Sequence, residues 1–258
     1  MADKAAEDID VLKRRNFNPG TLLGPLPAVL VTVGDMERAG VLTVAWCGIL
    51  SSTPARAYVS VRPSRYSHSF LKENGEFVIN LTTEELAYAT DYAGIYTGAK
   101  VDKFEKLSLT KLESEKVAPP TIAQSPLSLE CRVFEVLEMG THDVFMADIL
   151  SVSVRDDIID EKGKICLERA GLLAYAHGEY FALGRSLGRF GFSTDKKAPS
   201  AAKKAASSKK AASAKTDKPE GENKLKRADF IKNGKNKKPT GKSGKFKKSK
   251  KDKGGVGN

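Results

Sequence analysis

Charge is divided unevenly along this chain, and the division limits how much of it can form a core. Residues 1–195 contain 21 Lys and Arg against 27 Asp and Glu, a net charge of −6, whereas residues 196–258 contain 22 against 5, a net charge of +17. The few large apolar side chains of the basic segment are Leu225, Phe230, Ile231, Phe246 and Val256. They cannot offset the roughly 1–2 kcal/mol of backbone entropy lost per ordered residue. We therefore expect an acidic folded body and a disordered basic C-terminal tail.

Two interpretations of the tail stay open. A polycation neutralises phosphates and releases counterions, which gives sequence-independent, salt-sensitive binding to nucleic acid or another polyanion. The alternative is a solubilising tail without a dedicated partner, because charge composition alone does not choose between them. Its only aromatic residues are Phe230 and Phe246, and no folded nucleic-acid-binding motif accompanies it, so a base-specific reader is not expected.

Length and composition predict three segments: an N-terminal arm over residues 1–19, one domain over residues 20–195, and the tail over residues 196–258. No apolar run approaches the ~20 residues that span a bilayer, and the N-terminus is charged, unlike a signal peptide. Cys47, Cys131 and Cys166 are odd in number and widely spaced, which argues against a disulfide framework. We expect a cytoplasmic protein with no membrane contact and no metal site, since no Cys/His spacing resembles a zinc motif.

Hydrophobic periodicity predicts a β-rich domain with two short helices. Strands are predicted over residues 28–33, 41–46, 57–62, 76–81, 127–137, 144–154 and 180–183. A helix over residues 67–74 would begin with the capping hydroxyl of Ser67 and end before Gly75. A second helix over residues 83–93 would carry Glu84 and Glu85 in its first turn. This pattern favours a closed or partly closed antiparallel barrel of all-β or α+β class.

The segment directly after the second predicted strand carries polar groups that a core does not require. Gly48 allows close backbone approach, and the hydroxyls of Ser51, Ser52 and Thr53 follow it. A flat ligand could lie against such a stretch. The alternative is an ordinary strand-to-loop transition with Trp46 in the core.

Residues 62–68 leave a strand and open a helix. The guanidinium groups of Arg62 and Arg65, the hydroxyl of Ser67 and the free amides of a helix N-terminus together favour a phosphate site. The alternative is a capped helix with solvated arginines.

Two further residues are candidates for an anionic ligand. Lys103 could add a positive charge, although a single lysine in a charged loop is usually solvated. His142 lies in a predicted strand turn, where an imidazole either completes the turn or donates to a carbonyl or an anionic ring system. No nucleophile elbow, Rossmann fingerprint or P-loop is present, so the residues alone predict a site for a phosphate-bearing ligand and no covalent catalyst.

Four stretches, taken in order, resemble the flavin reductase-like family of FMN-binding split barrels, particularly its flavoredoxin branch. They are VLTVAWCGILSSTPARAYVSVRPSRYSHSFLKENGEFVINL, YTGAKVDKFEK, LECRVFEVLEMGTHDVFMADI and LLAYAHGEYFALG. The resemblance covers residues 20–192 and leaves the tail outside. It implies a six-stranded antiparallel Greek-key split barrel with short helices, forming a homodimer with FMN near the subunit interface.

The resemblance also implies roles for single residues. Trp46 and the backbone through Ser51, Ser52 and Thr53 would lie along the isoalloxazine ring. The FMN phosphate would be held by Arg62, Arg65 and Ser67. Lys103 would contact the flavin, His142 would stand beside its ring as the catalytic donor, and Tyr175 or His177 would lie near the flavin or nicotinamide face.

Two positions depart from the family pattern. Gly40 stands where relatives often have Asn, which removes a side-chain contact to the ring. Arg65 stands where many relatives have Ser, which should strengthen phosphate binding.

The resemblance implies an FMN-dependent oxidoreductase, either an NAD(P)H:flavin reductase or a flavoredoxin-like electron carrier. NADH or NADPH would be the electron donor, and free flavin, an iron–sulfur protein or another acceptor would receive the electrons. Two alternatives stay open. One is a flavin-binding carrier or sensor without its own NAD(P)H activity. The other is an FMN-binding dimeric scaffold whose basic tail binds nucleic acid or another polyanion.

Overall fold

The computed structural model describes residues 14–194. The chain divides into two compact units, Met1–Arg189 and Phe190–Asn258. In the second unit only residues 190–194 are described, and they include a 3-10 turn over Phe192–Thr194. The basic tail predicted over residues 196–258 and most of the predicted N-terminal arm lie outside the described residues.

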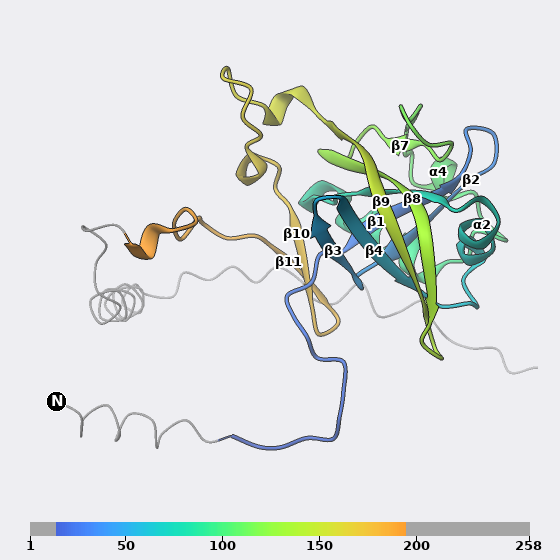
Figure 1. Ribbon diagram of the computed structural model, residues 1–258, viewed down its shortest axis with the longest axis horizontal. Coiled ribbons are helices and arrows are strands. Elements are labelled where there is room, and N and C mark those ends of the chain that lie inside the picture. Colours follow the sequence, from blue (N-terminus) through green and yellow to red (C-terminus); the bar gives the residue numbers. More distant parts are fainter. Residues whose placement is uncertain (1–13, 195–258) are drawn as a thin grey trace, which may run out of the picture. The chain divides into compact units, whose positions relative to one another are not determined.

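The first unit is built on one antiparallel sheet (Figure 1). Its strand order is β2 (Ala39–Val44), β1 (Val29–Gly34), β5 (Glu76–Asn80), β8 (Leu127–Glu138), β9 (Asp143–Val154), β4 (Ala55–Val61) and β3 (Cys47–Ser52). Two small two-stranded sheets accompany it, formed by β6 (Lys111–Leu112) with β7 (Thr121–Ile122) and by β10 (Leu173–Ala176) with β11 (Glu179–Ala182). The expected β-rich class is confirmed, and the main sheet has seven strands, one more than the six expected.

Hairpins build most of the sheet, and the remaining pairings join strands that are distant in sequence. β1 pairs with β2, and β8 pairs with β9 over almost their full lengths. β5 then pairs with β1 on one side and β8 on the other, and β4 pairs with β9. Because β2 and β4 also touch although they are not neighbours in the sheet, the sheet curls around a single core.

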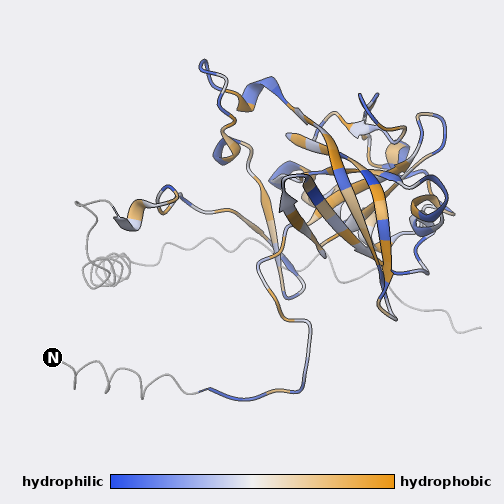
Figure 2. Cartoon of the chain, viewed as in Figure 1, coloured by the Kyte–Doolittle hydropathy of each residue, from blue (hydrophilic) through white to orange (hydrophobic). Residues whose placement is uncertain are grey.

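Strand residues that alternate inward fill this core. Figure 2 shows hydrophobic residues concentrated in the strands and hydrophilic ones in the connecting loops. Phe77, Phe145 and Val31 are fully buried in the cluster that the curled sheet encloses. Full burial of such a side chain stabilises the fold by about 1.5–3 kcal/mol. A second cluster, which includes Leu30, Val41, Leu86, Ala93 and Phe104, packs helical residues on the other face of β1 and β2.

Helix α2 (Tyr66–Asn74) ends as predicted but begins differently. Gly75 adopts φ 65° and its N–H donates to the Leu71 carbonyl, which is the left-handed C-cap that favours glycine. The prediction that the Ser67 hydroxyl caps this helix is wrong. Arg65 is the N-cap residue and no side chain caps the helix, so Ser67 lies buried inside the first turn.

The second predicted helix is split. A 3-10 turn over Glu84–Leu86 precedes helix α3 (Ala87–Ile95), and the Thr83 side chain makes no capping bond. Helix α4 (Lys103–Lys106), which is one turn long, was not predicted. The Asp102 carboxylate caps it by accepting hydrogen bonds from the Phe104 and Glu105 amides.

Strand β3 is the strand of the main sheet that was not predicted. Its residues were predicted to form either a surface for a flat ligand or an ordinary strand-to-loop transition. It pairs with β4 at the edge of the sheet, with a bulge between Ile49 and Ser51. None of its six residues is buried, so the sequence shows no inward and outward alternation there. Among residues 14–194, no helix is long and apolar enough to cross a membrane.

Candidate functional site

Two of the three residues predicted to hold the phosphate, Arg65 and Ser67, line one cavity together with Lys103, which was predicted to contact the flavin, whereas Arg62 does not line it. Arg65 and Ser67 come from the start of α2, and Lys103 comes from the start of α4. The cavity has a volume of about 60 Å³, and its other lining residues are Ser64, Tyr66, Ala93, Tyr96, Thr97 and Gly98. The fold therefore brings together donors that the sequence presents in two separate segments.

Lys103 is buried in this cavity, contrary to the solvated alternative. The residue is 5 % exposed, and its Nζ donates to the carbonyl oxygens of Val41 at 2.8 Å and Ala93 at 2.7 Å. Burial, followed by the nearby charge of Arg65, lowers the pKa of Lys103 to about 8. An ammonium has three N–H donors, so one remains for a ligand in the cavity.

Ser67 and Arg65 complete a donor set for an anion. No hydrogen bond joins the buried Ser67 hydroxyl to another residue of the described part of the chain, so it is available to a ligand. Arg65 is exposed and forms no ion pair within residues 14–194. Arg65 and Ser67 at the start of the nine-residue helix α2, together with Lys103 of α4, fit a phosphate group.

A second group of site residues lies at the ends of three neighbouring strands. In the sheet Val61 pairs with Asp143, and the Ser60 amide donates to the Trp46 carbonyl at 2.8 Å. This register places Trp46, Arg62 and His142 at the same ends of β3, β4 and β9. The imidazole of His142 packs on the Trp46 indole with ring centroids 4.6 Å apart and planes inclined by 37°.

His142 is held by its turn and perturbed by its surroundings. Its carbonyl accepts from the Met139 amide at 2.9 Å, and its Nδ1 lies 3.0 Å from the Thr141 hydroxyl oxygen. Burial, followed by the positive charge of Arg62, lowers the pKa of His142. A neutral imidazole with Nδ1 engaged by Thr141 leaves Nε2 as the free ring nitrogen.

Residues 62–67 join the two groups. Arg62 acts on His142 through its charge, and Arg65 acts in the same way on Lys103. The Arg65 amide donates to the Arg62 carbonyl at 3.0 Å, which folds the segment into a turn between them. One short segment thus connects an aromatic end of the site with a cationic end.

The remaining predicted residues do not line the cationic cavity. Ser51 and Ser52 lie at the end of edge strand β3, and Thr53 lies in the turn that follows. Tyr175 belongs to the hairpin of β10 and β11, where its backbone pairs with Leu26 and its ring lies 5.4 Å from that of Tyr180.

His177 occupies the turn of that same hairpin, with φ 51°. No contact within residues 14–194 brings Tyr175 or His177 to Arg65, Lys103 or His142.

Tyr96, Thr97 and Gly98 were not predicted as lining residues, although they begin the quoted stretch YTGAKVDKFEK. A Cβ added at Gly98 would lie 2.8 Å from a carbon of the Tyr66 ring, so this close approach requires glycine. A Cβ at Gly40 would lie 3.4 Å from the Ser67 hydroxyl oxygen. The glycine at position 40 therefore leaves room beside Ser67.

Comparisons with known proteins identify the family and the fold. Residues 24–184 match the family described as flavin reductase like domain. An uncharacterized protein of Archaeoglobus fulgidus is 43 % identical over 143 residues, which are 55 % of this chain and 80 % of that protein. FMN reductase (NADH) RutF of Serratia proteamaculans is 24 % identical over 157 residues, covering 61 % of this chain and 87 % of that protein. Flavoredoxin of Desulfovibrio vulgaris (Miyazaki F) superposes with a TM-score of 0.65 at 28 % identity, covering 69 % of this chain and 98 % of that one.

Proposed function

Because the chain belongs to the flavin reductase-like domain family and has the split-barrel fold of flavoredoxin, we propose that it is an FMN-dependent oxidoreductase supplied with electrons by NADH or NADPH. The family supports a flavin cofactor and oxidoreductase activity in general. The name FMN reductase (NADH) of a relative supports the choice of FMN and of a nicotinamide donor. The observation that carries the proposal is the cavity that unites Arg65, Ser67 and Lys103.

The cationic end of the site would hold the phosphate. The Arg65 guanidinium and the Lys103 ammonium supply charge-assisted hydrogen bonds, and the Ser67 hydroxyl supplies a neutral one. Because Lys103 is already fixed by two backbone carbonyls, it loses little conformational freedom when a ligand arrives. Bound FMN would supply the redox chemistry, which no side chain of this site can perform.

The aromatic end would face the isoalloxazine ring. Trp46 is 37 % exposed and offers a flat apolar surface beside His142. The free Nε2 of His142 can donate a hydrogen bond to negative charge on a ring system, and the nearby Arg62 charge adds to the same stabilisation. Ser51, Ser52 and Thr53 would border the ring through β3. Tyr175 would lie near the flavin or nicotinamide face, although no contact within residues 14–194 joins it to Trp46 or His142.

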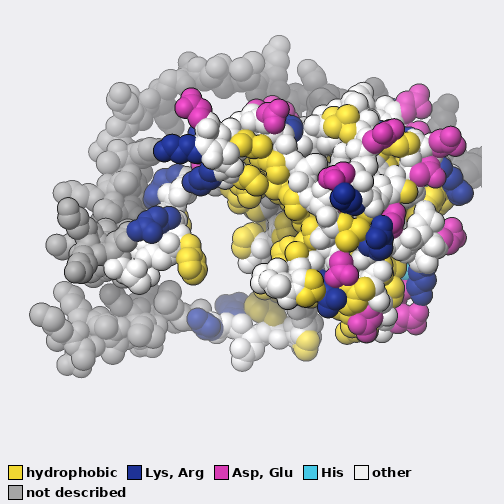
Figure 3. All heavy atoms as spheres, turned by 45° about the horizontal axis from the view of Figure 1, so that its top comes forward, with side chains coloured by type: hydrophobic (Ala, Val, Ile, Leu, Met, Phe, Trp, Pro, Cys, Tyr) yellow, Lys and Arg dark blue, Asp and Glu magenta, His cyan; other side chains and the backbone are white. Residues whose placement is uncertain are grey.

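A homodimer is part of the proposal. The edge strand β3 exposes Ile49 by 66 % and Leu50 by 47 %, next to Trp46. Figure 3 shows that hydrophobic side chains reach the surface between charges of both signs. An edge strand with apolar side chains is a candidate for pairing with a second copy, so sedimentation of I49E/L50E should give a monomer where the unmodified protein gives a dimer.

The first experiment is the visible absorption spectrum of the purified protein, followed by identification of the released chromophore. A flavin band that releases FMN supports the proposal, and a colourless protein that fails to bind added FMN overturns it. Stopped-flow mixing with NADH and NADPH then separates a reductase from the alternative, a flavin carrier without NAD(P)H activity. Bleaching of the flavin band with either donor identifies the reductase.

The phosphate site has its own test. The double variant R65A/S67A should bind FMN more weakly while its affinity for riboflavin, which lacks the phosphate, stays unchanged. R169A removes one exposed arginine from the Leu167–Arg169 turn and serves as the control for charge. Retention of full FMN affinity in R65A/S67A would remove these residues from the site.

A further inference from the structure

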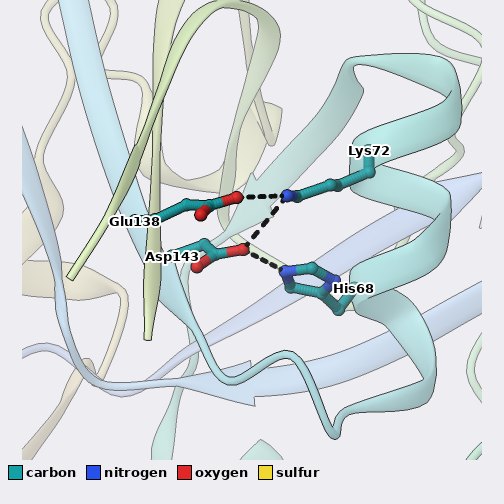
Figure 4. Close-up of polar contacts among 4 residues, drawn as sticks. All are labelled: His68, Lys72, Glu138 and Asp143. Carbon is teal, nitrogen blue, oxygen red and sulfur yellow. Dashed lines mark hydrogen bonds and ion pairs between the residues drawn. The ribbon is translucent and has the colours of Figure 1, made fainter. Parts of the chain in front are cut away.

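Four polar side chains join helix α2 to the base of the β8–β9 turn, and the site described above does not use them (Figure 4). The His68 Nε2 lies 2.7 Å from Asp143 Oδ2. The Lys72 Nζ lies 2.9 Å from Glu138 Oε1 and 3.6 Å from Asp143 Oδ2. One helix therefore contacts the last residue of β8 and the first residue of β9, which pair with each other in the sheet.

The inner half of this cluster is buried. The side chains of His68 and Asp143 are 10 % and 5 % exposed, and the His68 ring packs edge-on against Phe145 at a centroid distance of 5.3 Å. A carboxylate buried to this extent needs its hydrogen bonds, because an unpaired charge there costs several kcal/mol. His68 satisfies Asp143 from the protein interior, while Lys72 reaches it from the surface.

The strand ladder ends at the Glu138–Asp143 pair, and one backbone hydrogen bond, from the Met139 amide to the His142 carbonyl at 2.9 Å, closes the turn beyond it. Beyond that pair the turn contains exposed Met139, Gly140 at φ 83° and His142. Exposed turns of this kind are usually more mobile than the strands that carry them. The contacts from α2 hold both strands where the turn leaves the sheet.

The two buried members are direct sequence neighbours of site residues. His68 follows Ser67, which lines the cationic cavity, and Asp143 follows His142, which packs on Trp46. A 2.7 Å hydrogen bond therefore links the phosphate end of the site to its ring end. We propose that His68 and Lys72 are positioning residues that fix His142 on Trp46 relative to the start of α2. The effect of this positioning on a bound flavin rests on the proposed function.

The first test needs no flavin. Trp46 is the only tryptophan of the chain, so the emission of the flavin-free protein reports the His142–Trp46 contact. The emission spectrum of H142A is that of Trp46 without the His142 contact. We expect H68L to shift the emission toward that of H142A, and H68Q, which keeps an N–H donor for Asp143, to restore the wild-type spectrum. Wild-type emission in H68L, or no restoration in H68Q, would overturn the proposal.

A double variant tests whether the two residues act on the same contact. If His68 acts through His142, H68L/H142A has the emission of H142A alone, and the effects of the single changes do not add. Additive effects would show that His68 acts on Trp46 by another route, and the proposal would fail. In the flavin-bound protein the midpoint potential of bound FMN should follow the same non-additive pattern.

If H68L does not fold, a variant of Lys72 tests the same proposal. The Lys72 side chain is 44 % exposed, so K72M removes the outer contacts with little risk to the core. K116M is the matched control, because Lys116 forms an exposed ion pair with Glu115 at 2.7 Å. We expect K72M but not K116M to shift the Trp46 emission toward that of H142A, and equal spectra for both variants would overturn the proposal. A protein that binds no flavin would refute the proposed function while these emission results still decide the positioning role.

Discussion

The His142 imidazole packs on the Trp46 indole at a centroid distance of 4.6 Å, although the two residues come from different turns of the sheet. Strand β4 lies between them and carries Arg62 directly after its last residue. The contact therefore follows from the register of three strands, and it presents an aromatic surface beside two groups that can stabilise negative charge.

The affinity for FMN should depend on pH through Lys103. Its pKa of about 8 means that the ammonium loses its proton, and its attraction for the phosphate, as the pH rises above 8. A hydrogen bond to a charged group contributes about 1.5–3 kcal/mol, so the dissociation constant for FMN should rise about tenfold or more at alkaline pH. Titration of FMN at several pH values measures the effect.

Arginine at the same position separates this effect from titration of the ligand. K103R keeps its charge throughout this range, so its FMN affinity should change little between pH 7 and pH 9. Riboflavin binding to the unmodified protein should also be flat. A wild-type FMN affinity that stays constant across pH 8 would contradict the role of Lys103.

Removal of the Arg62 charge should raise the pKa of His142. Burial is the larger cause of its lowered pKa and stays in place in R62Q, so the pKa should move only part of the way toward the ordinary histidine value. An NMR pH titration of the imidazole signals measures it, with the His142 signal assigned by its loss in H142A. R169Q is the control, and an unchanged His142 pKa in R62Q would place Arg62 outside electrostatic reach.

Alanine at position 98 should disturb the cationic cavity. The new Cβ would lie 2.8 Å from the Tyr66 ring, and overpacking of this kind usually costs about 1–3 kcal/mol. G98A should therefore unfold at lower urea concentration and bind FMN more weakly. G184A meets no atom within 4 Å and is the matched control, expected within about 0.5 kcal/mol of wild type. Equal stability and FMN affinity in the two variants would count against a tight wall at Gly98.

The basic tail should bind nucleic acid in a salt-dependent manner. Residues 196–258 carry a net charge of +17 and residues 1–195 carry −6, so non-specific attraction to the phosphate backbone of a nucleic acid should come from the tail. A mobility-shift assay should show binding by the full chain that weakens steeply with salt, and none by a protein truncated to residues 1–195. Absence of a shift for the full chain at low salt would favour the solubilising interpretation.

Much of the sheet could be predicted from local pattern. The predicted strands over residues 28–33, 76–81 and 127–137 correspond to β1, β5 and β8 within one or two residues, because buried strands are bounded by clear turn signals. Strand β3 and helix α4 were missed. The first lies at a sheet edge and buries none of its residues, and the second is one turn held by the Asp102 cap and by tertiary burial of Phe104.

The candidate site was predictable as separate segments only. Arg65 and Ser67 were recognised from the start of a helix, and His142 from a turn, since each signal lies within a few residues. His68, Lys72 and Asp143 gave no such signal, because their importance arises only when α2 meets the β8–β9 hairpin. Tyr175 was inferred from resemblance, and within residues 14–194 no contact ties it to the cavity.

The amino-acid sequence by itself determined the division into an acidic body and a basic tail, the β-rich pattern and the family resemblance, since composition and periodicity are local properties of the chain. Only the tertiary structure decided that Lys103 is buried against two carbonyls with a lowered pKa, that it meets Arg65 and Ser67 in one cavity, and that His142 packs on Trp46. Those properties depend on strand register and on desolvation by distant segments, and both are created by the pairing of residues that are far apart in the sequence.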